Sequence, residues 1–172
     1  LSDNELCSIA SKIGADVAFF IRGGTCIAEG IGEKLTAVQW KFCNHDLLII
    51  KPNFSVSTES VYKNISEKHF SNKKNIDSIV NSLDNPVKLG KKLENILENV
   101  TIALNPKIKD IKNILIENRS CGALMSGSGS AVFGLFKDKK TAADAYNNIS
   151  KEKEIRCFLC HFHDRSSKEN VK

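Results

Sequence analysis

Two apolar segments flank a short loop of small residues between Cys121 and Phe136. The core of this loop, Ser126 to Ser130, alternates serine with glycine and carries three hydroxyl groups. Glycine adopts positive φ without a Cβ penalty, so the backbone amides of such a loop can converge on an anion. The pattern predicts two strands joined either by a tight structural turn or by a loop that contacts phosphate. The residues of the loop alone leave both interpretations open.

Apolar periodicity in the rest of the chain predicts alternating strands and helices. An apolar strand is expected at 46–51, followed by four helices, the two strands around the loop, a helix at 141–149 and a strand containing Cys157. The clearest amphipathic helix is expected from Leu89 to Leu104. This order is typical of a two-layer α+β domain, with a sheet on one side and helices on the other.

The N-terminal part, residues 1–40, is expected to contain a helix and two strands, at 25–29 and 35–38. We expect it to have no sheet partners of its own and assign it to the incomplete tail of a preceding domain. Residues 41–172 are assigned to the α+β domain. Because the sequence opens at Leu1 without a methionine or a signal-peptide pattern, we expect it to be part of something longer.

Composition excludes several classes of protein. A hydrophobic content of 41% over 172 residues is enough for a core, and 25 Lys and Arg against 20 Asp and Glu give a net charge of +5. The lysines are scattered without interleaved aromatics, which favours a solvated surface over a nucleic-acid face. No stretch approaches the apolar length of a membrane span. Six singly placed cysteines favour a reducing cytoplasm over a disulfide framework.

One cysteine pattern could be taken for a haem or metal site. Cys157 to His161 matches the C-x-x-C-H spacing of covalent haem attachment. The segment is rich in strand-forming residues, however, and residues three apart in a strand point to opposite faces. We therefore expect these cysteines to be core and edge-strand residues, and we expect no metal site.

Asp16 is a candidate general base. It follows Gly14 at the end of the first expected helix and precedes the apolar pair Phe19 and Phe20. A carboxylate held against apolar side chains can have its basicity tuned by desolvation and accept a proton. From position alone, a helix cap or a turn aspartate is the better interpretation.

Thr58 and Tyr62 are candidates for binding a planar base. They are four residues apart in a helix that Ser57 and its neighbours are expected to open, so they share one face. A hydroxyl beside an aromatic ring can hydrogen-bond the edge of a base while the ring stacks on its face. A capping threonine and a half-buried tyrosine would explain the pair equally well.

Taken together, the segments resemble in order the 4-diphosphocytidyl-2-C-methyl-D-erythritol kinases of the GHMP kinase superfamily. The resemblance extends through about Ile149 and corresponds to the C-terminal part of a typical member. The segments that carry it are Ile13–Phe20, Gly23–Thr25, Ala28–Glu33, Lys51–Pro52, Ser57–Tyr62, Asn95–Glu98, Asn105–Ile108 and Ala123–Gly134.

The resemblance implies a ferredoxin-like GHMP kinase C-terminal domain preceded by the tail of a ribosomal S5-like ATP-binding domain. It implies transfer of the ATP γ-phosphate, with Mg²⁺, to the 2-hydroxyl of 4-diphosphocytidyl-2-C-methyl-D-erythritol, in the non-mevalonate isoprenoid route. A cytoplasmic monomer or homodimer is expected, with small molecules as partners and neither nucleic acid nor membrane.

The resemblance also implies roles for individual residues. Asp16 matches the family's presumed base, and Thr58 and Tyr62 match positions that line the cytosine pocket, with the Tyr62 ring stacked on the base. The third superfamily motif, a glycine-rich loop on the phosphate side of the site, is matched by Gly127, Ser128, Gly129 and Ser130.

The sequence also departs from the family. Ala18 stands where proline is common, and Ile96 where aspartate is usual, which puts any polar role of that position in doubt. The family's ATP loop, Pro-x-x-x-Gly-Leu-Gly-Gly-Gly-Ser-Ser, occurs nowhere in the sequence, so we expect no turnover from this chain alone. Two alternatives stay open: a GHMP kinase for another small alcohol, such as a mevalonate derivative, and a non-catalytic binding module on the same fold.

Overall fold

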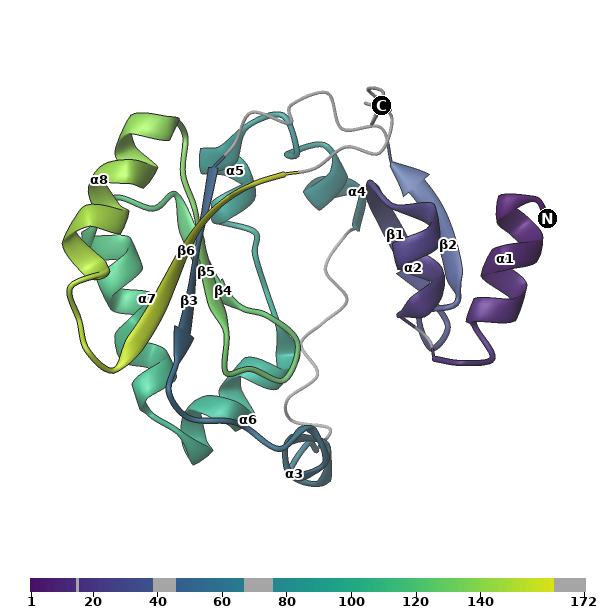
Figure 1. Cartoon of the computed structure of the whole chain (residues 1–172), viewed down its shortest axis with the longest axis horizontal. Coiled ribbons are helices and arrows are strands. Elements are labelled where there is room, and N and C mark those ends of the chain that lie inside the picture. The colour runs from purple at the N-terminus through teal and green to yellow at the C-terminus, as the bar shows by residue number, and fades with distance from the viewer. Residues whose placement is uncertain (15, 39–45, 67–75, 163–172) are drawn as a thin grey trace. The chain divides into compact units, whose positions relative to one another are not determined.

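The structure is a computed structural model, and it describes residues 1–14, 16–38, 46–66 and 76–162. Internal contacts divide the chain into two compact units, with the division between Cys43 and Asn44. The described residues up to 38 form the N-terminal unit, and those from 46 onward form the C-terminal unit (Figure 1).

The described residues of the N-terminal unit form two short helices followed by two strands: α1 (Asp3–Ala10), α2 (Val17–Arg22), β1 (Thr25–Glu29) and β2 (Lys34–Val38). A capping box starts α1, because the Ser2 hydroxyl accepts from the Glu5 amide and the Glu5 carboxylate accepts from the Ser2 amide. The Ser2 amide, and after it the Ser2 hydroxyl, donates to the Glu5 carboxylate and so holds the pKa of Glu5 below its usual value. The apolar segment after Asp16 is helical and contacts α1.

Strands β1 and β2 pair with each other in an antiparallel two-stranded sheet. The expectation that this part of the chain lacks sheet partners of its own is therefore wrong, because a hairpin supplies both partners locally. Its turn uses positive φ at Gly30 (71°) and Gly32 (107°). The assignment of residues 1–40 to the tail of a larger domain stays a prediction.

The described residues of the C-terminal unit have the predicted α+β order with one more helix than expected. Its elements are β3 (Asp46–Pro52), α3 (Thr58–Lys63), α4 (Ile76–Val80), α5 (Pro86–Gly90), α6 (Ile96–Leu104), α7 (Lys107–Glu117), β4 (Gly122–Met125), β5 (Val132–Leu135), α8 (Lys139–Ile149) and β6 (Ile155–His161).

The helix expected from Leu89 to Leu104 is in fact two helices. Helix α5 ends at Gly90, where an added Cβ would collide with the Cys121 carbonyl oxygen, so the two backbones approach closely. Helix α6 starts anew after Asn95, whose side-chain oxygen accepts from the Leu97 amide at 3.0 Å. The apolar repeat runs through both helices. Apolar spacing alone therefore does not reveal the break at the capping asparagine.

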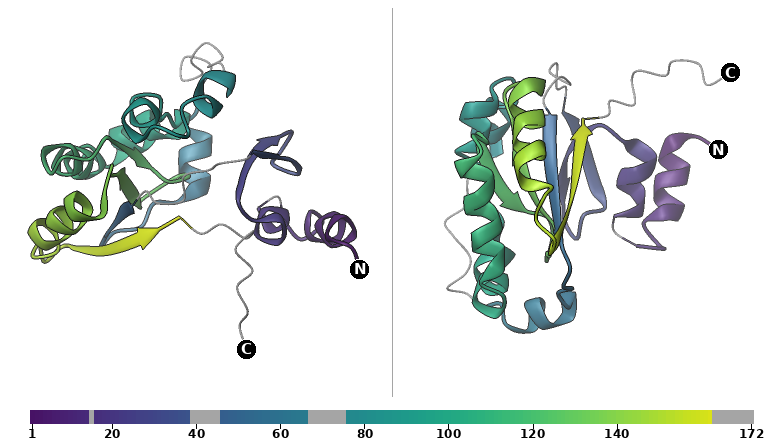
Figure 2. Two further views of the ribbon diagram at one scale, coloured as in Figure 1. Left: turned by 90° about the horizontal axis from the view of Figure 1, so that it is seen from above. Right: turned by 60° about the vertical axis from the view of Figure 1, so that its left-hand side comes forward.

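The four strands of the C-terminal unit form an antiparallel sheet in the order β4-β5-β3-β6. Because β3 lies between β5 and β6, and α8 connects these two, the unit has the split β-α-β arrangement of ferredoxin-like folds. Helix α7 contacts β4 and β5, and α8 contacts β3 and β6. Both helices lie on the same face of the sheet (Figures 1 and 2), which confirms the two-layer prediction.

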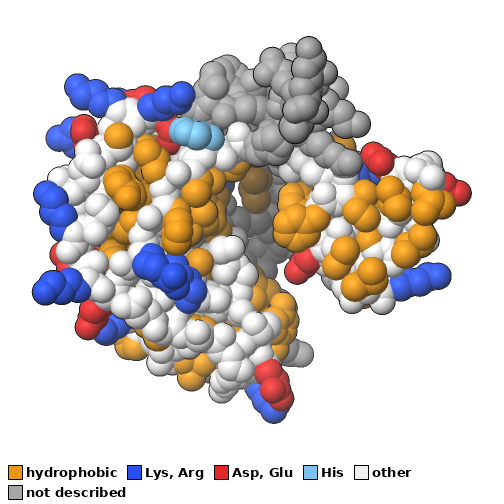
Figure 3. Space-filling view, viewed as in Figure 1, with side chains coloured by type: hydrophobic (Ala, Val, Ile, Leu, Met, Phe, Trp, Pro, Cys, Tyr) orange, Lys and Arg blue, Asp and Glu red, His pale blue; other side chains and the backbone are white. Residues whose placement is uncertain are grey.

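The core lies between the sheet and these helices. On β3, Leu48 and Ile50 are fully buried on the helix side, whereas Leu47 and Ile49 are only partly buried on the opposite face. Ile49 pairs across the sheet with Phe158 of β6, which is 48% exposed. On the face of the C-terminal unit shown in Figure 3, apolar side chains gather around β6, and basic side chains lie both beside them and along the outer edge. The sheet thus positions the loop between β4 and β5 on a rigid, helix-backed support.

Candidate active site

The glycine–serine loop joins β4 to β5 as a closed turn. The Ser126 amide donates to the Ala131 carbonyl at 2.9 Å, and the Gly129 amide donates to the Ser126 carbonyl at 2.9 Å. Gly127 and Gly129 have φ values of 55° and 92°, a region that side chains disfavour. The two glycines are therefore required by the path of the backbone.

Helix α6 holds the carbonyl groups of this loop. The Asn95 side-chain amide donates to the carbonyls of Met125 (2.9 Å) and Gly127 (2.7 Å), and the Thr101 hydroxyl donates to the Ser128 carbonyl (3.2 Å). The Gly127 carbonyl and the Ser128 amide belong to one trans peptide and therefore point in opposite directions. Because Asn95 binds this carbonyl, the Ser128 amide points away from Asn95. Among the described residues, none accepts a hydrogen bond from the amides of Gly127 and Ser128. These two amides are available to an anion.

A hydrogen bond joins the loop to helix α3. The hydroxyls of Thr58 and Ser128 lie 2.8 Å apart. Ser57 rather than Thr58 caps α3, because the Ser57 hydroxyl accepts from the Ser60 amide at 3.2 Å. The Thr58 side chain is therefore free of a capping role, and it brings two predicted parts of the site into contact.

Tyr62 lies one helical turn beyond Thr58 and is 59% exposed. Its neighbour Val61 is fully buried and packs against the core, so α3 turns one side toward the protein and the tyrosine toward solvent. The alternative interpretation of Tyr62 as a half-buried residue does not fit the exposure of this ring. An exposed ring near a loop with free amides can stack on a planar base.

The structure adds a polar network that sequence reasoning missed. The Lys51 ammonium donates to the Ser130 hydroxyl (2.6 Å) and to the carbonyls of Phe54 (3.0 Å) and Pro52 (3.4 Å). Ser130, only 2% exposed, donates in turn to the Phe54 carbonyl at 2.7 Å. An ammonium has three protons, and all three point at protein oxygens. Lys51 therefore anchors the loop, and its one sequence signal is a lysine that directly follows four apolar residues, 47–50.

Glu98 is a second residue missed from the sequence. One of its oxygens accepts from the Met125 amide at 3.0 Å, and the other accepts from the Lys112 ammonium at 2.5 Å. The side chains of Glu98 and Lys112 are 11% and 25% exposed, so this ion pair is largely buried. It ties the end of β4, directly before the loop, to helices α6 and α7.

Asp16 occupies the N-cap position of α2 in the N-terminal unit, yet its side chain makes no capping hydrogen bond. The carboxylate is exposed, and Phe20 is 79% exposed. The expected apolar enclosure of Asp16 by its own segment is therefore wrong. The buried side of α2 is formed by Ala18, which leaves the phenylalanine rings on the outer side.

No group of three or more histidine, cysteine or acidic side chains among the described residues is arranged to hold a metal ion. No helix in the same part of the chain has the length and apolar character needed to cross a membrane.

Comparison with known proteins identifies the family. The model that describes the C-terminal part of GHMP kinases matches residues 63–155, more than half of the chain. The chain belongs to the GHMP kinase family. The matched range includes the glycine–serine loop, α6 and α7.

Curated relatives of this GHMP kinase chain have a narrower name. It is 42% identical over 158 residues to the 4-diphosphocytidyl-2-C-methyl-D-erythritol kinase of Clostridium botulinum, covering 90% of this chain and 56% of the relative. The enzyme of the same name from Clostridium novyi is 40% identical over 148 residues, covering 85% of this chain and 52% of the relative. The chain thus spans about half the length of the curated relatives it matches, and the resemblance seen in the sequence is confirmed.

Solved structures agree with the family. A crystal structure of 4-(cytidine 5'-diphospho)-2C-methyl-D-erythritol kinase superposes with a TM-score of 0.75 at 27% identity, covering 91% of this chain and 56% of that one. The homoserine kinase from Cytophaga hutchinsonii superposes with a TM-score of 0.66 at 20% identity, covering 86% and 50%. The second match supports the fold alone.

Proposed function

We propose that this chain supplies the acceptor-side part of an ATP-dependent kinase for the 2-hydroxyl of 4-diphosphocytidyl-2-C-methyl-D-erythritol. Support comes from the 42% identity to enzymes of that name over 90% of the chain. The structural observation that carries the proposal is the 2.8 Å contact between Thr58 and Ser128. It joins a helix with an exposed aromatic ring to a loop with free amides, and the substrate has both a flat base and a diphosphate.

The cytidine end is assigned to α3. The exposed Tyr62 ring offers a stacking face, and the Thr58 hydroxyl offers a donor and an acceptor one turn away. Stacking of one base on one aromatic ring contributes about 1–3 kcal/mol. The pair thus serves to recognise the part of the substrate that does not react.

The phosphate end is assigned to the loop formed by Gly127, Ser128, Gly129 and Ser130. Free amides in a glycine-rich turn favour an anion. ATP is the expected phosphate donor and Mg²⁺ its usual companion. Mg²⁺ bound to ATP would neutralise part of the phosphate charge, and we assign no further step to it.

Asp16 is assigned the role of general base. Its carboxylate accepts the proton of the 2-hydroxyl while the hydroxyl oxygen bonds to the γ-phosphorus of ATP and ADP leaves. Its exposure and its lack of a capping bond support this role, since the side chain has no structural use within its own helix. Phosphoryl transfer depends mainly on positioning and charge neutralisation, so the base contributes alongside these larger effects. A cytoplasmic monomer or homodimer is part of the same proposal.

Kinetics on the protein as its gene encodes it test the assignment. Asp16→Asn is expected to lower kcat by roughly 10²–10⁴-fold, the range for a lost general base. Asp144→Asn, an exposed aspartate on α8, serves as the matched control and should leave kcat unchanged. Equal turnover of Asp16→Asn and the control would remove Asp16 from the mechanism.

Binding measurements test the cytidine end. Tyr62→Ala is expected to weaken binding of the cytidine substrate by about 1–3 kcal/mol, with little change in kcat. Calorimetry with CDP on the same variants separates binding from chemistry. Turnover of homoserine or mevalonate in place of the cytidine substrate would overturn the assignment in favour of another GHMP kinase. The 172-residue chain by itself is expected to give no product, because the family's ATP loop is absent from its sequence.

A further inference from the structure

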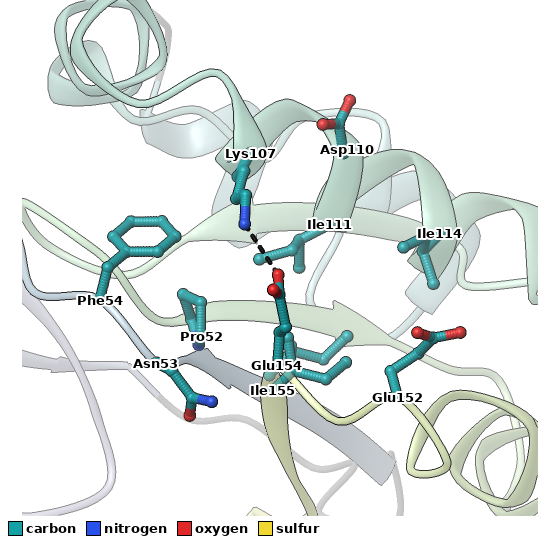
Figure 4. A pocket seen from close by; sticks show the side chains of 11 residues that line it. Pro52, Asn53, Phe54, Lys107, Asp110, Ile111, Ile114, Glu152, Glu154 and Ile155 are labelled. Carbon is teal, nitrogen blue, oxygen red and sulfur yellow. Dashed lines mark hydrogen bonds and ion pairs between the residues drawn. The ribbon is translucent and has the colours of Figure 1, made fainter.

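A cavity at one end of the sheet lies outside the proposed active site. It has a volume of about 480 Å³, within the usual 300–1,000 Å³ range of small-molecule pockets. Figure 4 shows isoleucines of α7 directed toward the strands, with a phenylalanine ring at the side. The apolar lining residues are Ile50, Pro52, Phe54, Ile111, Ile114 and Ile155. The floor of the cavity is therefore suited to an aliphatic chain.

Charged side chains surround the mouth. Lys107 of α7 and Glu154 before β6 extend toward one another, with the ammonium and the carboxylate 2.8 Å apart (Figure 4). This contact raises the pKa of Lys107 and lowers that of Glu154. Asp110 and Glu152 also belong to the lining, and in Figure 4 the Asp110 carboxylate is directed outward from α7. Because Glu154 is already paired with Lys107, Asp110 and Glu152 leave the surroundings of the mouth with a net negative charge, which favours a cation.

Phe54 connects this cavity to the glycine–serine loop. Its side chain lines the cavity, and its carbonyl accepts hydrogen bonds from Ser130 (2.7 Å) and Lys51 (3.0 Å). A ligand that displaces the ring therefore acts on the same residue that holds the buried end of the loop. Coupling between two sites requires a physical link of this kind.

We propose that the cavity binds a small molecule with an aliphatic body and a single ammonium group, and that the glycine–serine loop senses its occupation through Phe54. The aliphatic body lies against the isoleucines, and the ammonium group lies among the carboxylates of the mouth. The site is separate from the residues assigned to cytidine and phosphate, so the proposal does not rest on the kinase function.

NMR on the full chain with ¹³C-labelled isoleucine methyl groups tests the binding. Hexylammonium is the probe and hexanoate, of the same chain length and opposite charge, is its control. Hexylammonium is expected to shift the methyl groups of Ile111 and Ile155 saturably while leaving Ile9 of α1 unchanged. Hexanoate is expected to bind at least tenfold more weakly. Equal binding of the two probes would overturn the charge assignment, and no saturable shift would overturn the site.

Variants locate the probe and test the link. Ile114→Trp fills the cavity and should abolish the shifts, whereas Ile116→Trp, at a position 51% exposed on α7, should keep them. The double variant Asp110→Asn, Glu152→Gln changes only exposed groups and should lower the affinity for hexylammonium about two- to thirtyfold. Amide signals of Ser128 and Ser130 should shift at the same probe concentrations as the methyl groups. Methyl shifts without amide shifts would overturn the coupling.

Discussion

The two glycines of the loop provide a matched test of how the loop is built. Both have positive φ, but their surroundings differ. A Cβ on Gly127 would meet nothing within 4 Å, whereas a Cβ on Gly129 would lie 2.8 Å from the Met125 sulfur and 3.4 Å from a Thr101 methyl carbon. Met125 is 1% exposed and Thr101 fully buried, so neither side chain can swing into solvent.

The expected costs follow from these contacts. Gly127→Ala bears only the backbone penalty of the left-handed region, about 1–2 kcal/mol. Gly129→Ala bears a similar penalty plus an overpacking cost of about 1–3 kcal/mol, for a total of roughly 2–5 kcal/mol. Ser126→Ala, in the same loop at an exposed position with negative φ, should change stability by less than about 0.5 kcal/mol.

Urea denaturation followed by far-ultraviolet circular dichroism measures the three losses. The midpoint should fall in the order Ser126→Ala, Gly127→Ala, Gly129→Ala with an unchanged slope. If Gly129→Ala lowers the free energy of unfolding no more than Gly127→Ala does, the close contact of Gly129 with Met125 is contradicted. If neither exceeds Ser126→Ala, the positive φ values are wrong.

Two further predictions concern carboxylates. Glu98→Ala should lower the free energy of unfolding by about 1–3 kcal/mol in the same denaturation assay, because the Met125 amide and the Lys112 ammonium lose their acceptor. Glu98→Gln keeps an acceptor and should cost less. Equal losses for the two variants would contradict this reasoning. Lys107→Gln should raise the pKa of Glu154 in a ¹³C NMR titration. Since the pairing lowers that pKa, its stabilising effect is present at neutral pH and lost as the pH falls; an unmoved pKa would refute the pairing.

The parts of the fold that sequence could predict are those encoded locally. The loop between β4 and β5 follows from small residues between apolar runs, and the α+β order follows from apolar periodicity. The break between α5 and α6 was missed because it depends on one capping asparagine and on a glycine pressed against a distant backbone. Both strands of the N-terminal part were predicted but not their pairing with each other, because strand-forming composition does not say which strand is the partner.

The residues themselves supplied the candidates for the site, and the family resemblance chose among the interpretations that they left open. Thr58 and Ser128 were both predicted, and the structure brings their hydroxyls into contact. The bonds from Lys51 to Ser130 and from Glu98 to Met125 join residues far apart in sequence, and no spacing rule points to them. The enclosure expected around Asp16 failed because neighbouring apolar residues in a short helix need not face the same side. Its catalytic role stays a prediction.

The position of β3 in the sheet has a consequence for synthesis of the protein. This strand is the first of its unit to leave the ribosome, yet its two neighbours, β5 and β6, come from the far end of the unit. Leu48, for example, pairs with Gly134 and with Leu159. Until those segments have been translated, β3 has no strand to pair with, and unpaired apolar strands are prone to aggregate. The nascent chain is thus most in need of chaperones during the interval in which α3 to α7 emerge.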